Sequence, residues 1–227
     1  MKIAGFEKVS FIELKGKVSS IIFTQGCNYK CVYCHNYNLI PLESETGLID
    51  EKEVWDYLEK RKGYVDAVTV TGGEPTLQPD LKDFLRKLKD MGFYVKLDSN
   101  GTNPGILKEI LDEGLADYVA MDIKASLEKY DEIVQMPVNK ENIKKSIKLL
   151  MDFGSYEFRT TVFPSLTADD FHKIGELIKG ANIYFVQQFR NKETLAASDV
   201  EPYKKEKLYE FADIMKKYVK KVEVRGL

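Results

Sequence analysis

The sequence lacks the features that define several large classes of protein. Lysine plus arginine number 34 and aspartate plus glutamate 36, so the formal net charge is −2 and no excess of cations is present for a nucleic-acid backbone. No apolar run approaches the roughly 20 residues of a membrane-spanning helix. Residues 1–17 contain no signal-peptide core. These absences predict a soluble, cytoplasmic protein with neither nucleic acid nor membrane as a partner.

Cysteine is scarce, and the three present stand together as Cys27, Cys31 and Cys34. An odd number in one cluster does not form a disulfide framework. In a reducing compartment such clusters usually bind metal or perform redox chemistry. Three thiolates can fill three corners of an iron–sulfur cubane, leaving one iron open. The alternative is a zinc knuckle, but a closed zinc site requires four protein ligands, and His35 adjoins Cys34 too closely to converge on the same ion.

The chain alternates between apolar, β-branched runs and amphipathic stretches. Helical spacing of apolar residues occurs at Leu81, Phe84, Leu85 and Leu88, at Ile143, Ile147, Leu150 and Met151, and at Leu208, Phe211, Ala212 and Met215. Six runs are predicted to be buried strands: Ser19–Thr24, Ala67–Thr71, Tyr94–Asp98, Tyr118–Ile123, Glu157–Phe163 and Ile183–Phe189.

Strands separated by helices predict a parallel sheet built from βαβ units. Six units are fewer than the eight of a full barrel, so we expect an α/β fold, a partial (β/α)6 open barrel of parallel strands, with a doubly wound sheet as the alternative. Phe6–Leu14 is predicted to be an N-terminal strand extension and Val222–Val224 a final strand. With no linker or internal repeat, residues 1–227 are expected to form a single domain.

Polar residues gather where the predicted strands end. Because parallel strands end at one edge of a sheet, these residues can share one site. In strand order they are Cys27, then Thr71-Gly72-Gly73-Glu74-Pro75, then Asp98-Ser99-Asn100-Gly101, then Asp122 and Lys124, then Arg159, then Gln187-Gln188.

Each of these residues also has an ordinary structural interpretation. Gly72-Gly73 can be a tight turn in which the main chain comes close to a ligand. Asp98 and Asp122 can be capping residues. Arg159 can be a surface charge, although its apolar neighbours Phe158 and Val162 indicate that it needs a partner.

The cysteine segment resembles the signature of the radical S-adenosylmethionine family, C-x3-C-x-aromatic-C, with Tyr33 at the aromatic position. The resemblance implies a radical SAM-type partial barrel. It also implies a [4Fe–4S] cluster held by Cys27, Cys31 and Cys34, with S-adenosylmethionine bound at the fourth iron. Tyr33 would present backbone atoms to the adenine.

The later segments resemble motifs of the branch that activates glycyl radical enzymes. Gly72-Gly73-Glu74 is similar to the family's GGE motif, which implies contact with the methionine amino group. The D-S-N-G segment beginning at Asp98 and the D-I-K segment beginning at Asp122 are also similar. They imply a Na⁺ or K⁺ site at Asp98, Ser99 and Asp122 beside the methionine carboxylate. By the same resemblance, Lys124 and Arg159 would bind that carboxylate and the ribose region.

One segment departs from the pattern of pyruvate formate-lyase activases, which carry a histidine after the sixth strand. This chain has Gln187-Gln188-Phe189-Arg190 there. Glutamine donates and accepts hydrogen bonds but does not take up a proton, so Gln188 is expected to contact the cofactor without acid–base chemistry. This version is more similar to the activating branch of anaerobic ribonucleotide reductase.

The resemblance therefore implies a radical SAM oxidoreductase. It would cleave S-adenosylmethionine reductively to a 5′-deoxyadenosyl radical and abstract hydrogen from a glycine of a large partner, anaerobic ribonucleoside-triphosphate reductase. Flavodoxin or ferredoxin would supply the electron. No general base is needed, and no separate catalytic side chain is expected. The alternatives are a small-molecule enzyme similar to 7-carboxy-7-deazaguanine synthase and, in a different class, a zinc-binding interaction domain.

Overall fold

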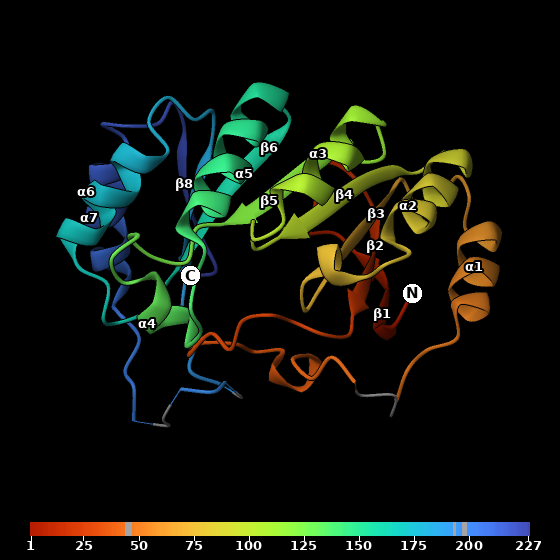
Figure 1. The fold of residues 1–227 in the computed structure, drawn as a ribbon, viewed down its shortest axis with the longest axis horizontal. Coiled ribbons are helices and arrows are strands. Elements are labelled where there is room, and N and C mark those ends of the chain that lie inside the picture. The colour runs from red at the N-terminus through yellow and green to blue at the C-terminus, as the bar shows by residue number, and fades with distance from the viewer. Residues whose placement is uncertain (44–46, 193, 197–198) are drawn as a thin grey trace. The chain divides into compact units, whose positions relative to one another are not determined.

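The computed structural model of the chain describes residues 1–43, 47–192, 194–196 and 199–227 (Figure 1). The strands in the described residues are hydrogen-bonded in chain order from β1 to β8. They are β1 (Ile3–Ser10), β2 (Ser19–Thr24), β3 (Ala67–Gly72), β4 (Tyr94–Ser99), β5 (Tyr118–Asp122), β6 (Tyr156–Val162), β7 (Tyr184–Gln188) and β8 (Val222–Arg225).

The pairing of the strands confirms the predicted α/β fold with an open, mostly parallel sheet. β1 runs antiparallel to β2, whereas β2, β3 and β4 are parallel, as are β6, β7 and β8. A doubly wound sheet reverses its strand order at a switch point. The order found here has no reversal, so the open partial barrel is confirmed and the doubly wound sheet is not.

The N-terminal strand lies earlier in the chain than predicted. β1 ends at Ser10, whose register partner on β2 is Ser19, and the predicted continuation to Leu14 is wrong. Phe11 is 73% exposed and Ile12 88% exposed, so these apolar residues belong to the connection between the strands. The apolar pattern extends past Ser10, but the chain must turn there to bring Ser19 opposite.

The helices lie between the strands, as the spacing predicts. They are α1 (Glu51–Lys60), α2 (Leu81–Asp90), α3 (Pro104–Asp112), α4 (Tyr130–Val134), α5 (Lys140–Phe153), α6 (Ala168–Leu177) and α7 (Lys205–Met215), with short 3-10 helices η1 (Tyr37–Leu39) and η2 (Pro75–Leu77). The predicted apolar faces of α2, α5 and α7 are buried, except that Met151 is only half-buried. Within the described residues, none of the helices is long and apolar enough to cross a membrane.

The chain divides into two compact units. The N-terminal unit comprises Met1–Asn28, Asn38–Ser99 and Gly105–Val119, and the C-terminal unit comprises Tyr29–Tyr37, Asn100–Pro104 and Ala120–Leu227. The chain passes between the units more than once, so neither corresponds to one continuous segment.

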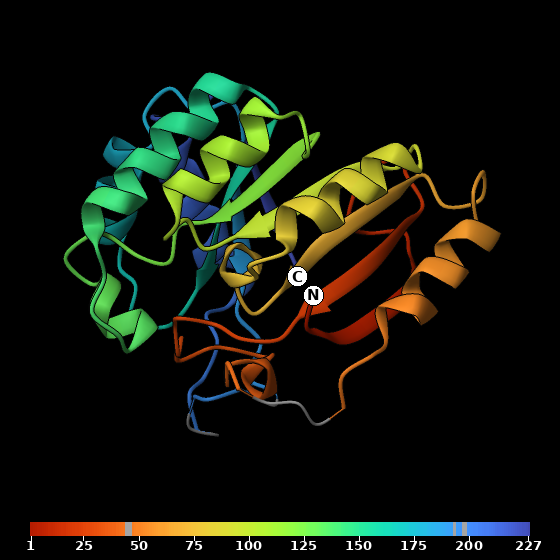
Figure 2. The same ribbon diagram turned by 45° about the vertical axis from the view of Figure 1, so that its right-hand side comes forward.

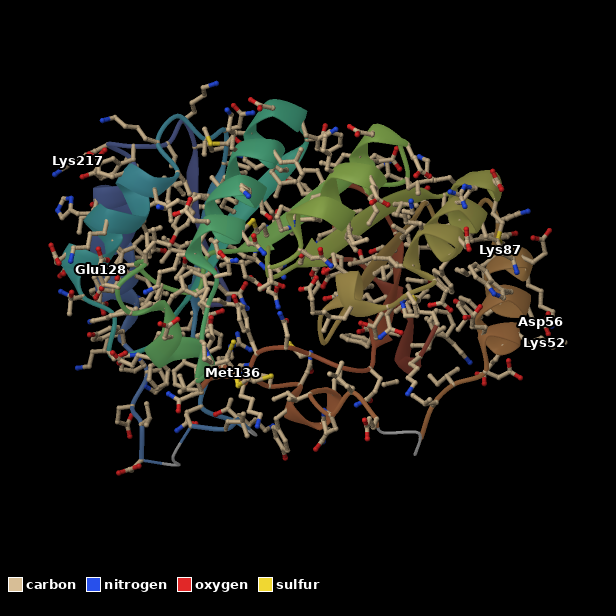
Figure 3. The ribbon with its side chains drawn as sticks, viewed as in Figure 1. Lys52, Asp56, Lys87, Glu128, Met136 and Lys217 are labelled. Atoms are coloured by element: carbon tan, nitrogen blue, oxygen red, sulfur yellow. The ribbon has the colours of Figure 1, made fainter. Side chains whose placement is uncertain are left out.

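In the N-terminal unit, α1 and α2 lie beside one face of β2 and β3 (Figure 2). Trp55 of α1 packs on Phe84 of α2 with ring centroids 4.4 Å apart, and the Lys87 ammonium lies 4.1 Å from the Trp55 ring. The outer side of α1 carries the Lys52–Asp56 pair, which is solvent-exposed (Figure 3). The helices therefore bury aromatic faces and expose their charges.

In the C-terminal unit, α6 and α7 lie together beside β8 (Figure 1). Their contact includes a stacked pair, Phe171 and Phe211, with centroids 4.2 Å apart. The start of α6 is fixed by a capping box between Thr167 and Asp170. Asp170 also accepts hydrogen bonds from Ser126 at 2.7 Å and Lys129 at 2.8 Å. Although burial alone would raise it, these partners lower the pKa of Asp170 to about 2.

Replacing Asp170 should remove part of the stability of the fold in a pH-dependent way. Because the folded pKa is depressed from 3.8 to about 2, the ionised carboxylate stabilises the protein above pH 4, and that stability is lost as the pH falls through this window. Urea unfolding should show a loss of about 2 kcal/mol in Asp170→Asn at pH 6, shrinking toward pH 2. Asp169→Asn, at an exposed i,i+4 pair, is the matched control. Equal pH dependence of stability in both variants would contradict the role given to the ionised Asp170 carboxylate.

Candidate functional site

Cys27 lies in the N-terminal unit, just beyond the end of β2. Its backbone N–H donates to Ile40 O at 3.1 Å, and the preceding Gly26 N–H donates to Leu39 O at 2.7 Å. The carbonyl of Gly26 accepts a hydrogen bond of 2.8 Å from Glu74 N–H. The first cysteine is thus held between the segment that follows η1 and the turn that follows β3.

The Gly72-Gly73 turn is glycine-rich because two stretches of main chain meet there. Gly72 has φ +117°, and a Cβ on it would lie 2.3 Å from Thr24 N. A Cβ on Gly73 would lie 2.0 Å from Gly26 O. Within this unit the close approach is made to the backbone of β2 and Gly26, and the predicted approach to a ligand stays a prediction.

The carboxylate of Glu74 is fully buried and joins two strand ends. Its Oε1 accepts hydrogen bonds from Thr76 N–H at 3.2 Å, from Thr76 Oγ1 at 2.5 Å and from Ser99 Oγ at 2.9 Å. Pro75 stands at the first position of η2, where its fixed φ and missing N–H suit the start of a helix. Glu74 and Ser99 therefore link the turn after β3 to the end of β4.

Asp98 is also buried and contacts a lysine that the sequence analysis did not select. Thr71 Oγ1 donates to Asp98 Oδ2 at 3.1 Å. Asp98 Oδ1 lies 3.4 Å from the ammonium of Lys96, which is itself 1% exposed. Lys96 also lies 3.0 Å from Glu13 Oε2. Asp98, at the end of β4, thus lies beside a cationic side chain of the protein itself.

The other two cysteines lie in the C-terminal unit on a loop fixed by α4. Lys30 N–H donates to Val134 O and Val32 N–H to Ile133 O, both at 3.0 Å. Cys34 N–H donates to Cys31 O at 2.9 Å, which closes a turn between the two thiols. These bonds involve four residues of the loop, so its course is set by backbone hydrogen bonds.

Burial controls the acidity of this loop's side chains. Burial raises the pKa of Cys31 to about 11 despite the nearby Lys124 ammonium, and it raises the pKa of Cys34 as well. The Tyr33 ring is buried, with the Lys124 ammonium 5.8 Å from its centroid. Among the residues that the structure describes, no three His, Cys, Asp or Glu side chains are grouped to hold a single metal ion.

Asp122, at the end of β5, lies between the two cations predicted from the sequence. Arg159 Nε lies 2.6 Å from its Oδ1 and Lys124 Nζ 3.0 Å from its Oδ2. The three side chains are only 13–21% exposed. Although burial alone would raise it, Arg159 and Lys124 hold the pKa of Asp122 well below its usual range. The C-terminal unit thus brings together the predicted D-I-K motif and Arg159.

The ion cluster continues through Glu157 to β8. Arg159 Nη1 is 4.0 Å from Glu157 Oε1, and Arg225 forms a bidentate pair with Glu157 at 2.9 and 3.3 Å. Arg225 also lies 3.5 Å from the centroid of Phe185. Arg159 therefore lies between Asp122 and Glu157, and the cluster joins the end of β5 to β6 and β8.

Gln188 is held by the backbone around it. Its Nε2 donates to Phe189 O at 2.8 Å and to Tyr203 O at 3.2 Å. His35, next to Cys34, has its Nε2 2.8 Å from Arg190 O. The end of the cysteine loop is therefore tied to the segment that follows β7.

Sequence reasoning missed Lys96, Glu157, Glu13 and Arg225. Lys96 and Glu157 stand inside strands, next to fully buried apolar residues, as Arg159 does. A charge in that setting needs a partner, so the argument used for Arg159 could have selected both of them. Glu13 lies in a turn and Arg225 at the end of β8, where a charge carries no such signal.

Comparison with known proteins assigns the family. Residues 21–178 match the Radical SAM superfamily. A Methanocaldococcus jannaschii protein named "Putative glycyl-radical enzyme activating enzyme" is 37% identical over 99% of this chain and 96% of its own length. The Escherichia coli pyruvate formate-lyase 1-activating enzyme is 29% identical over 78% of this chain and 75% of its own length. The chain belongs to the radical SAM superfamily, in the branch of enzymes that activate glycyl radical enzymes.

Solved structures show the same fold. A domain of the pyruvate-formate lyase-activating enzyme from Bacteroides vulgatus superposes with a TM-score of 0.55 at 18% identity, over 70% of this chain and 99% of that domain. A queuine lyase from Clostridium spiroforme gives a TM-score of 0.64 at 15% identity, over 98% of this chain and 96% of its own. At such identities the likeness concerns the fold alone.

The donor chemistry of the residues fits the [4Fe–4S] cluster and S-adenosylmethionine that the superfamily implies. Cys31 and Cys34 are thiols on one fixed loop, and a bound metal would remove the proton that burial otherwise keeps on them. Lys124 and Arg159 are cations of the kind that pair with a carboxylate such as that of S-adenosylmethionine. Family membership favours the iron–sulfur interpretation over the zinc-binding domain.

Gly73→Ala should destabilise the N-terminal unit, because its Cβ would meet backbone rather than a flexible side chain. We expect a loss of about 3 kcal/mol in the free energy of urea unfolding. Gly105→Ala in α3 is the matched control. No atom lies within 4 Å of a Cβ there, so stability should be unchanged or slightly higher. Equal stabilities for the two variants would show that the turn does not need its glycine.

Proposed function

We propose that this enzyme activates an anaerobic ribonucleoside-triphosphate reductase by removing a hydrogen atom from a backbone glycine of that partner. Membership of the activating branch supports a glycyl radical enzyme as the substrate. The choice of the reductase rests on the Gln187-Gln188-Phe189-Arg190 segment, which resembles that branch. Flavodoxin or ferredoxin is the proposed electron donor.

The predicted cofactor contacts form part of the same proposal. Cys27, Cys31 and Cys34 hold the [4Fe–4S] cluster, which together with S-adenosylmethionine supplies the radical chemistry. Tyr33, the Gly72-Gly73-Glu74 turn, Asp98, Ser99, Lys124, Arg159 and Gln188 bind or orient the cofactor. The observation that carries this assignment is the Lys124–Asp122–Arg159 cluster, where two largely buried cations lie on either side of one carboxylate. Both cations are already in place there, so an incoming carboxylate can pair with them without the burial of a new cation.

The predicted Na⁺ or K⁺ has a competitor within the protein. Asp98 is paired with Lys96, and Asp122 is paired with both Arg159 and Lys124. Each acid already has a cation within 3.4 Å, so neutralising its charge requires no inorganic ion. We therefore leave Na⁺ and K⁺ out of the proposal.

Lys124→Met should weaken S-adenosylmethionine binding while the cluster content stays normal. Removing a hydrogen bond to a charged group costs about 1.5–3 kcal/mol, which is roughly a 10- to 150-fold higher Kd. Isothermal titration of the anaerobically reconstituted protein measures the change. Lys129→Met breaks another lysine–aspartate pair of the same unit, with an N–O distance of 2.8 Å, and should leave the Kd unchanged. Equal affinity for S-adenosylmethionine in both variants would show that Lys124 has only a structural role.

The function itself is tested with a candidate reductase. Reconstituted enzyme, S-adenosylmethionine and a low-potential reductant should generate a glycyl radical signal on the reductase in electron paramagnetic resonance. Cys31→Ala should abolish the signal, because two thiolates do not hold a cubane. Conversion of a deazapurine precursor with no radical on any reductase would establish the deazaguanine alternative. A radical on a different glycyl radical enzyme would support the activating function but show that the partner is not the reductase.

A further inference from the structure

Lys96 is the most deeply buried charged side chain of β4, with 1% of its surface exposed. Lysine is almost never fully buried unless it is paired. Here the ammonium lies 3.0 Å from Glu13 Oε2, 3.3 Å from Glu13 O and 3.4 Å from Asp98 Oδ1. All of these residues belong to the N-terminal unit. None of the contacts predicted from the sequence requires this lysine.

The geometry of the strands gives Lys96 its partners. Residues two apart in a strand point to the same face, so Lys96 and Asp98 share one face of β4. Lys96 is in register with Thr69 on β3, and Thr71 on the same strand donates to Asp98 Oδ2. One oxygen of Asp98 thus faces a hydroxyl and the other an ammonium. Glu13 completes the arrangement from the connection between β1 and β2.

The two carboxylates differ in how much they depend on this cation. The Glu13 side chain is 25% exposed, so water can solvate it, whereas that of Asp98 is 9% exposed. A buried carboxylate without a cation is strongly unfavourable. The ammonium is therefore needed chiefly by Asp98, while Glu13 holds the lysine in place.

We infer that Lys96 is a built-in counter-ion for Asp98 that does the work of a monovalent inorganic cation. An ammonium and K⁺ both carry one positive charge and suit oxygen ligands. The lysine is covalently attached, so its effective concentration at Asp98 does not depend on the medium. Lys96 is a positioning residue: it keeps Asp98 charged and fixed in orientation at the end of β4. This role is independent of which enzyme is activated.

The role predicts a specific response to cations. The thermal midpoint of the cluster-free full-length protein should be the same in KCl, NaCl and tetramethylammonium chloride at matched ionic strength. Lys96→Met should lower the midpoint by about 10 °C in tetramethylammonium chloride, since an uncompensated charge remains buried. K⁺ or Na⁺ should recover at least half of that loss. The S-adenosylmethionine Kd of the reconstituted protein should show the same pattern.

A second variant separates a counter-ion from a packing role. Lys96→Met combined with Asp98→Asn removes the carboxylate charge that the lysine accompanies and should restore most of the lost midpoint, with no response to K⁺. Lys89→Met, at the Lys89–Asp117 pair of the same unit, is the matched control and should be neither cation-sensitive nor rescued by Asp98→Asn. A wild-type protein that needs K⁺ or Na⁺ would overturn the inference even if Lys96→Met does not fold. The inference would also be overturned if the thermal midpoint of Lys96→Met rose neither on addition of K⁺ nor on addition of the Asp98→Asn substitution.

Discussion

A charge buried in a protein is unfavourable by several kcal/mol unless an opposite charge lies within bonding distance. Both units of this enzyme are organised around that constraint. Asp122 at the end of β5 lies between Arg159 and Lys124, and Asp98 at the end of β4 is reached by Lys96. These pairs fix the side chains at the strand ends. A site that must hold a charged cofactor in one orientation depends on such preset charges.

The parts of the fold that local chemistry dictates could be predicted from the sequence. Ser19–Thr24 contains an apolar, partly β-branched centre, and β2 has those bounds. The apolar spacing from Leu81 to Leu88 corresponds to the buried face of α2. The grouping of polar residues after the strands followed from the parallel topology, and Asp122, Lys124 and Arg159 do meet. Gly72-Gly73 indicated that the main chain comes close to another group, for which the sequence suggested a ligand. Only the fold shows that the backbone of β2 lies beside this turn.

Contacts between distant residues could not be predicted. Glu13 and Lys96 are separated by 83 residues, and their pairing depends on how the connection after β1 folds over β4. The sequence reading also carried the first strand on to Leu14, because Phe11 and Ile12 continue its apolar pattern. The spacing of apolar residues indicates which residues suit a strand. Where the strand ends depends on which residues the neighbouring strand can pair with. Buried charges within strands are nevertheless a usable signal, because each demands a partner that a structure must supply.

The loop that carries Cys31 and Cys34 takes its shape from main-chain groups. Its hydrogen bonds to Ile133 and Val134 of α4 are made by backbone groups, and the turn from Cys31 to Cys34 is closed by another. Ordering a backbone costs on the order of 1–2 kcal/mol per residue, and these hydrogen bonds offset part of that cost. Because side chains take no part in them, the residues between the cysteines can change in sequence while the loop keeps its course. The position of the two thiols depends instead on α4, so a substitution that displaces this helix would disturb the cysteine loop without altering either cysteine.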